Sequence, residues 1–174
     1  MDLDAVKRSL ELELELDPDP SSSSSSSSPA AELPPSFYDA FVLHGLRIDA
    51  AEPRRVLCSL SVPPRLAVSP QCKSGFFLQN SESYLHSGVI ATLADVVGSA
   101  VFYSSGFPTS GVSLEISISY LDAAFINEEI EIEAKLLRVG KVVGVTSIEF
   151  RKKKTGKIIA QARHSKYLAV SSKL

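Results

Sequence analysis

The sequence predicts an α+β domain in which an antiparallel sheet wraps around one long central helix. The stretch 85–105 is mostly apolar and almost free of charge, as in a helix that is buried on most sides. After it come four segments in which apolar and polar residues alternate, which is typical of strands with one buried face. An apolar helix and an apolar sheet face are best buried against each other, so we expect the sheet to enclose the helix.

Turn signals separate the predicted elements. A short helix is expected over 37–46 and a strand over 56–62, which Pro63 and Pro64 end. The residues 67–83 have the composition of a loop. Because turns join neighbouring strands, the later strands should form antiparallel hairpins. These four strands are expected over 111–121, 129–139, 142–151 and 158–169.

The two ends of the chain differ in composition from the middle. Residues 1–34 contain an alternating Leu-Glu run and a serine tract, and we predict a disordered low-complexity tail there. The folded domain is expected over 35–170, followed by a C-terminal tail over 171–174. That tail is Ser172-Lys173-Leu174, the form of a peroxisomal targeting tripeptide. We therefore expect a peroxisomal import receptor as a partner, and a cytoplasmic protein if the signal is not read.

The overall composition is that of a soluble globular protein. Of the 174 residues 44% are hydrophobic and 22% charged, and the formal net charge is −2. This charge gives no basic field for nucleic acid, and no apolar run approaches the roughly 20 residues of a membrane span. Cys58 and Cys72 are too few for a disulfide framework or a structural zinc site, so we expect reduced thiols.

Asp95 is the most informative residue. It is the only acidic side chain over 83–114 and lies in the middle of the predicted helix, where it cannot be an N-cap. Burying a carboxylate without partners costs several kcal/mol. Asp95 is therefore either a hydrogen-bonded structural residue or part of a functional site. Small residues share its helical face, which leaves room for a ligand or another chain; they are Ala91, Thr92, Gly98 and Ser99.

Polar residues around the start of this helix have two possible interpretations each. His86, Ser87 and Gly88 begin the helix, where free backbone N–H groups can hold an oxyanion. His86 is either a capping residue or a catalyst. Asn80, in the preceding loop, is either a turn residue or a hydrogen-bonding residue of a site. The basic cluster 151–154 with Lys157 is either a solvated turn or a contact for phosphates.

Three segments resemble one enzyme family. They are 85–95 (LHSGVIATLAD), 111–120 (GVSLEISISY) and 155–166 (TGKIIAQARHSK). Together they are similar to the hotdog-fold acyl-CoA thioesterases, in particular the phenylacetate-degradation and thioesterase superfamily member 2 types. The resemblance covers about residues 50–169, and it implies that the sheet and helix form a hotdog fold.

The resemblance also implies catalytic roles. Asp95 matches the general base or nucleophile, Asn80 the residue that positions water or the thioester, and His86 the histidine at the helix entry. Where the family has His-Gly-Gly, this chain has Ser87 in place of the first glycine, whose amide is the expected oxyanion donor; Gly88 follows. The reaction implied is hydrolysis of an acyl-CoA to the free acid and CoA, with no metal or organic cofactor.

Further roles and an assembly follow from the same resemblance. Ser113 matches a serine that lines the site, although simple strand alternation places it on the polar sheet face. Its role therefore requires a bulge or a site between subunits. The family forms a homotetramer, a dimer of dimers with sites between subunits. Weaker matches to CoA-contacting positions are Tyr120, Arg138, Gly140 and Lys141.

Two other functions remain open at this stage. One is a hotdog-fold acyl-CoA hydratase or dehydratase that relies on His86, and the other is a non-catalytic acyl-CoA-binding protein. A fold alone does not decide between them. The sequence also leaves open whether aliphatic or aromatic acyl groups are preferred.

Overall fold

The computed structural model describes residues 37–68 and 83–168. The predicted tails, Asn80 and Cys72 lie outside these residues. The described elements, in chain order, are α2 (Phe37–Leu43), β1 (Arg47–Glu52), β2 (Arg55–Ser61), the 3-10 helix η1 (Pro64–Leu66), α3 (Ser87–Ser104), β3 (Val112–Tyr120), β4 (Glu129–Val139), β5 (Val143–Lys152) and β6 (Ile158–Tyr167).

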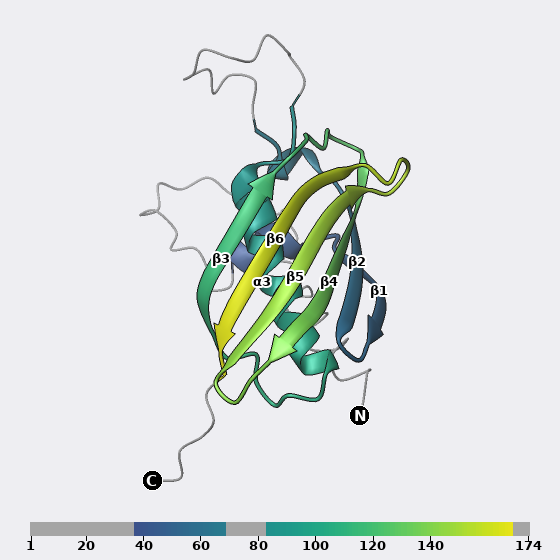
Figure 1. Cartoon of the computed structure of the whole chain (residues 1–174). Helices are drawn as coiled ribbons and strands as arrows, with labels where there is room; N and C mark the ends of the chain where they lie inside the picture. Colours follow the sequence, from purple (N-terminus) through teal and green to yellow (C-terminus); the bar gives the residue numbers. More distant parts are fainter. Residues whose placement is uncertain (1–36, 69–82, 169–174) are drawn as a thin grey trace, which may run out of the picture.

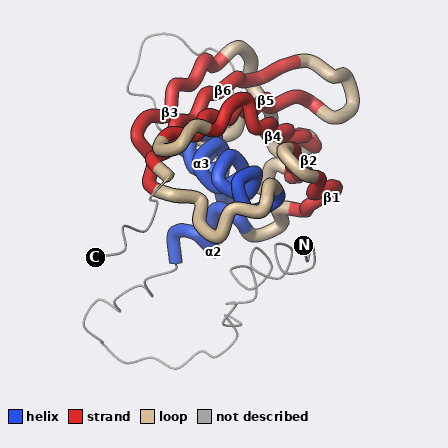
Figure 2. Tube along the Cα trace, turned by 60° about the horizontal axis from the view of Figure 1, so that its bottom comes forward, coloured by secondary structure: helices blue, strands red, loops and turns tan. Residues whose placement is uncertain are grey.

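One six-stranded antiparallel sheet wraps around α3 (Figures 1 and 2). The strand order is β1-β2-β4-β5-β6-β3, so β1 and β3 are the two edges. Helix α2 packs on the side of α3 that the sheet leaves open (Figure 2). This arrangement is the hotdog fold, and the predicted α+β architecture is confirmed.

The predicted elements match the observed ones with small shifts and one omission. The long helix and the five predicted strands are present. The first helix ends at Leu43 and not at 46, because Gly45 takes a positive φ of 85° that ends the helix and turns the chain into β1. Strand β1 was not predicted. Its partly exposed RIDAAE sequence lacks the alternation of a half-buried strand.

The core lies between α3 and the concave face of the sheet. Phe102 on α3 and Phe150 on β5 are among the largest fully buried side chains. By length and composition α3 could cross a membrane, but more than half of it is buried in the fold, as expected for a core helix. Cys58 is a free, buried cysteine, and burial raises the pKa of its thiol to about 12, so this thiol is unreactive at neutral pH.

Helix α3 approaches the sheet closely at two glycines. A Cβ at Gly98 on α3 would lie 3.1 Å from His164 Nδ1 and 3.2 Å from Thr146 Oγ1. A Cβ at Gly144 on β5 would lie 2.3 Å from the Phe102 ring. These two positions therefore set the distance between α3 and strands β5 and β6.

Replacing Gly144 with Ala should destabilise the fold by roughly 1–3 kcal/mol, the usual cost of overpacking a core. The added methyl would overlap the ring of Phe102, which is fully buried. Urea unfolding measures the change. Gly140→Ala in the adjacent hairpin is the control, since its Cβ would lie 3.4 Å from the nearest atom. Equal stability of the two variants would contradict this account of the packing.

Candidate active site

Asp95 lies at the centre of a polar cluster between α3, β3 and β6. Its Oδ1 accepts a hydrogen bond from Ser113 Oγ at 3.0 Å and one from Ser99 Oγ at 3.4 Å. Oδ1 also lies 3.4 Å from His164 Nε2 and 3.7 Å from Lys166 Nζ. Its side chain is 45% exposed, so Asp95 does not bear the full cost of a buried carboxylate. All four neighbours approach the same oxygen, and Oδ2 has no hydrogen-bond partner among the described residues.

A β-bulge in β3 places Ser113 in this cluster. The register of β3 against β6 shifts between Ser113 and Glu115, so that Leu114 is the extra residue. Ser113 then pairs with Lys166 and Ile116 with His164, and both partners are buried. A bulge reverses the face on which the preceding side chains lie. The strand alternation that seemed to oppose a role for Ser113 is thereby resolved.

His164 on β6 forms a hydrogen bond with Ser113. The imidazole is completely buried, and its Nε2 lies 2.9 Å from Ser113 Oγ. Burial, with a smaller effect of the Lys166 charge, lowers the pKa of His164 to about 4, so the ring is neutral at neutral pH. Since Ser113 donates to Asp95, its oxygen accepts from Nε2–H. Nδ1, which carries no proton, faces Gly98 and has no hydrogen-bond partner among the described residues.

Lys166 brings a buried positive charge to the same place. It is 4% exposed, and its Nζ donates to Ser99 Oγ at 2.6 Å. Burial lowers the pKa of Lys166, and the charge of Asp95 opposes that effect. The cluster thus contains one carboxylate, one ammonium, one neutral imidazole and two hydroxyls.

A second group of predicted residues meets at the start of α3. His86 is the N-cap, and its Nδ1 accepts from the Gly88 amide at 2.9 Å. The Gly88 amide is therefore engaged, whereas the Ser87 amide has no acceptor in the part of the chain that the structure describes. Tyr120, at the end of β3, donates its hydroxyl to the Ser87 carbonyl at 3.2 Å. Of the two backbone amides in this group, the Ser87 amide is the one left for a ligand.

The remaining predicted residues lie apart from both groups. Arg138, Gly140 and Lys141 are exposed at the end of β4 and in the β4–β5 hairpin. Within residues 37–68 and 83–168 they make no hydrogen bond or ion pair with the cluster around Asp95. Asn80 is outside the described residues, so its predicted role stays a prediction.

The basic cluster at the β5–β6 hairpin is largely neutralised by carboxylates. Lys152 pairs with Glu128 at 2.9 Å, and Lys157 pairs with Asp122 at 2.8 Å. Lys153 pairs with Glu129 at 3.1 Å. These pairs favour the interpretation of a solvated turn over that of a phosphate contact.

His164 and Lys166 were not predicted as functional residues, although the sequence carries a signal for them. In β6 the buried positions alternate from Ala160 and Ala162 to His164 and Lys166. Two ionisable residues on the buried face of a strand are expected to have polar partners, because burying them without partners is costly. Here the shared partner is Asp95, which lies far away in sequence.

Comparisons with known proteins show the family to which this chain belongs. Residues 82–159 match the model of the family described as the thioesterase superfamily. Acyl-coenzyme A thioesterase 13 of Mus musculus is 32% identical over 127 residues, which are 73% of this chain and 82% of that protein. The chain belongs to the thioesterase superfamily.

Solved structures of superfamily members share the fold. Zebrafish thioesterase superfamily member 2 has a TM-score of 0.72 and 27% identity, covering 97% of this chain and 99% of its own. The Mus musculus protein of the same name has a TM-score of 0.63 and 32% identity over 76% of this chain and 89% of its own. A Streptococcus pneumoniae thioesterase solved with coenzyme A has a TM-score of 0.59 and 20% identity, over 71% of this chain and 85% of its own.

Gly98→Ala should reduce turnover by about tenfold or more, because a small displacement of a catalytic group has a large effect on rate. The new methyl would push against His164, which holds Ser113 against Asp95. In an ordinary helix the same change stabilises by about 1 kcal/mol. Steady-state kinetics and thermal unfolding measured together test this. A more stable protein with unchanged turnover would contradict the proposed contact.

Proposed function

We propose that this chain hydrolyses acyl-CoA thioesters to the free acid and CoA, with Asp95 as the catalytic carboxylate. The observation that carries the proposal is the asymmetry of Asp95. Its Oδ1 is held by two hydroxyls, and its Oδ2 has no partner in the described part of the chain. A half-exposed carboxylate fixed through one oxygen leaves the other free to act on a substrate. The acyl-CoA thioesterases among the relatives support the choice of substrate.

The reaction uses Asp95 in one of two ways. As a general base, Oδ2 takes a proton from water while the water oxygen attacks the thioester carbonyl carbon. The tetrahedral oxyanion collapses, the C–S bond breaks, and the thiolate of CoA receives the proton. As a nucleophile, Oδ2 itself attacks and expels the thiolate, and water then hydrolyses the mixed anhydride. In both cases the Ser87 amide stabilises the oxyanion.

One chain does not provide both parts of this site. Ser87 and Asp95 are eight residues apart on α3, which corresponds to about 12 Å along the helix axis. A single carbonyl cannot accept from the Ser87 amide and be attacked at Asp95 of the same chain. We therefore propose that each site combines Asp95 of one subunit with the start of α3 from another.

The exposed edge of β3 supports a way to assemble such a site. Strand β3 is an edge strand, and exposed apolar side chains accompany it, among them Val112, Leu114 and Leu121. A free edge of this kind readily pairs with another strand. If two β3 strands pair antiparallel about their middle residue Ile116, then Tyr120 of one chain lies against Val112 of the other. The Ser87 end of one subunit would then meet the Ser113 and Asp95 end of its partner.

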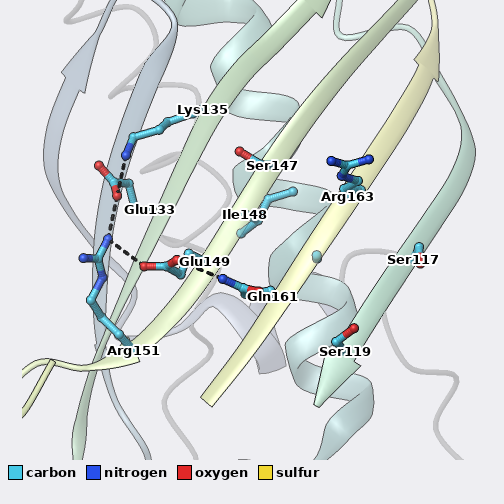
Figure 3. Close-up of a pocket in the computed structure, with 11 residues that line it drawn as sticks. Ser117, Ser119, Glu133, Lys135, Ser147, Ile148, Glu149, Arg151, Gln161 and Arg163 are labelled. Carbon is cyan, nitrogen blue, oxygen red and sulfur yellow. Dashed lines mark hydrogen bonds and ion pairs between the residues drawn. The ribbon is translucent and has the colours of Figure 1, made fainter. Parts of the chain in front are cut away.

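The convex face of the sheet supports a further pairing of dimers. A hollow of about 500 Å³ on this face is lined by polar and charged side chains (Figure 3). Burial opposes ionisation of Glu133 there, yet hydrogen bonds from Arg55, Lys135 and Arg151 lower its pKa to about 2. We propose that this polar face forms the contact between two dimers in a homotetramer.

Peroxisomal location is also a proposal. It is supported by the tripeptide Ser172-Lys173-Leu174 alone, which lies outside the described residues. A peroxisome would supply acyl-CoA esters, in line with the proposed reaction.

The hydratase or dehydratase alternative has less support. It relies on His86 as the acid or base, and the capping of α3 by Nδ1 leaves only Nε2 of His86 for that role. Release of free CoA thiol separates the two reactions, because only hydrolysis produces it.

Asp95→Asn should leave the fold intact and lower kcat by at least 10²-fold, the low end of the range for loss of general acid–base catalysis. Thiol release from a panel of aliphatic and aromatic acyl-CoAs measures this. Asp122→Asn is the matched control, since Asp122 pairs with Lys157 away from the site and should retain activity. Full turnover in Asp95→Asn would refute the assignment of this residue.

A mixture of two inactive variants should regain activity if sites form between subunits. Ser87→Pro removes the amide hydrogen, together with the serine hydroxyl, at the first helical position, where proline is tolerated and the preceding His86 is already extended. Co-expressed with Asp95→Asn, it should give about one quarter of the wild-type rate, since half of randomly paired dimers are mixed and carry one intact site. No recovery in the mixed protein would mean that each chain works alone.

A further inference from the structure

Three aromatic side chains of α2 are exposed beside α3. Phe37, Tyr38 and Phe41 are between 38% and 56% exposed, although the same helix buries Val42 and Leu43 in the core. The rings of Phe37 and Phe41 stack, with their centroids 5.7 Å apart. Exposed apolar side chains that gather in one place commonly mark a binding site. We name these three side chains the α2 aromatic patch.

Helix α2 is held in place from two sides. Its buried Val42 and Leu43 are part of the hydrophobic core. Arg65 in η1 donates from Nε to the Phe41 carbonyl at 3.0 Å, and its guanidinium also donates to the His44 carbonyl. The patch is therefore presented by a docked helix, and binding a ligand there would not require the helix to be ordered first.

A hydrogen bond joins the patch to the helix that carries Asp95. Tyr38 Oη lies 2.7 Å from Thr92 Oγ1, and Thr92 Oγ1 donates its own proton to the Gly88 carbonyl at 3.0 Å. The Tyr38 hydroxyl is therefore the donor to Thr92. Thr92 precedes Asp95 by three residues, so the two share a face of α3 and are about 4.5 Å apart along its axis. The patch thus begins about one helical turn from the candidate catalytic carboxylate.

The position and charge of the patch suit an acyl group. It lies on the side of α3 that the sheet leaves open (Figure 2). The one charged residue of α2 is Asp39, which would repel the phosphates of CoA and has no such effect on an uncharged acyl chain. In the proposed reaction the acyl carbonyl lies at Asp95. A chain that continues from there along α3 toward Thr92 reaches the patch.

We propose that the α2 aromatic patch binds the acyl group of the substrate and determines which acyl-CoA esters are preferred. This inference rests on the proposed hydrolysis and adds a specificity-determining surface to it. A long aliphatic chain would cover the aromatic rings and remove apolar surface from water, which favours binding. An acetyl group has a single methyl beyond its carbonyl and ends before the patch.

Acyl selectivity tests the patch, measured as the ratio of kcat/KM for dodecanoyl-CoA to kcat/KM for acetyl-CoA. Tyr38→Ala and Phe41→Ala should each lower this ratio by about tenfold, the usual effect of losing one covered aromatic side chain. General damage to the fold would lower both rate constants alike and leave the ratio unchanged. If Phe41→Ala does not fold, Tyr38→Ala is sufficient, because Tyr38 is the most exposed of the three.

Two further variants serve as controls. Tyr167→Ala removes a tyrosine that is 45% exposed on the opposite face of the sheet from α3, and it should keep the wild-type ratio. Tyr38→Phe keeps the ring and removes only the hydrogen bond to Thr92, so its ratio should fall less than that of Tyr38→Ala. Equal falls in Tyr38→Phe and Tyr38→Ala would assign the effect to the hydroxyl and overturn the apolar role of the patch.

A binding measurement separates failure of this inference from failure of the proposed function. Calorimetry compares the Kd of a non-hydrolysable thioether analogue of dodecanoyl-CoA with that of CoA alone. The wild-type protein should prefer the analogue, and Tyr38→Ala should reduce that preference by about tenfold. A reduced preference in a protein that releases no CoA would contradict only the hydrolysis. If neither the preference nor the kinetic ratio changes in any folded patch variant of an active enzyme, something other than the acyl group occupies the patch, and the inference is overturned.

Discussion

The close approach of α3 to β5 and β6 is the constraint on which the site depends. It is possible because Gly98 on the helix and Gly144 on the sheet leave room for His164 and for Phe102. A wider spacing would move Asp95 away from the sheet and out of reach of Ser113. A single large residue at either glycine would thus affect both the packing of the core and the geometry of the carboxylate. The stability of the core and the geometry of the Asp95 cluster therefore both depend on the distance between the backbone of α3 and those of β5 and β6.

The balance of charge in the cluster follows from the same packing. Complete burial makes the imidazole of His164 neutral, so it serves as a hydrogen-bond donor and adds no charge. Lys166 is almost as deeply buried, yet it has a carboxylate within 3.7 Å. One side of Asp95 therefore faces a fixed, low-dielectric arrangement of donors, while the other side faces the surface. Such an arrangement needs little reorganisation during a reaction, which is the usual source of electrostatic catalysis.

The sequence predicted the fold better than it predicted the site. Periodicity located α3 and five strands, because each has one buried face and a clear turn at its ends. It missed β1, whose exposure alternates weakly, and it placed Ser113 on the wrong face, because the extra residue Leu114 has no local signature. The contact between Ser113 and His164 depends on the register of β3 against β6. That register is a property of the folded sheet and not of either segment alone.

The length of α3 finally explains why a fold this small would need a partner. The helix start and Asp95 are about 12 Å apart along the helix axis, so the proposed oxyanion donor and the proposed catalytic carboxylate of one chain cannot reach the same carbonyl. In an antiparallel pairing of two β3 edges, the two chains run in opposite directions. The start of α3 of each subunit would then lie near the Asp95 cluster of the other, once at each end of the paired strands. In the proposed dimer, the same exposed edge that would otherwise favour aggregation would complete two equivalent sites. The proposed chemistry would then require the exposed strand, and an isolated subunit would keep its Asp95 cluster while lacking the donor opposite it.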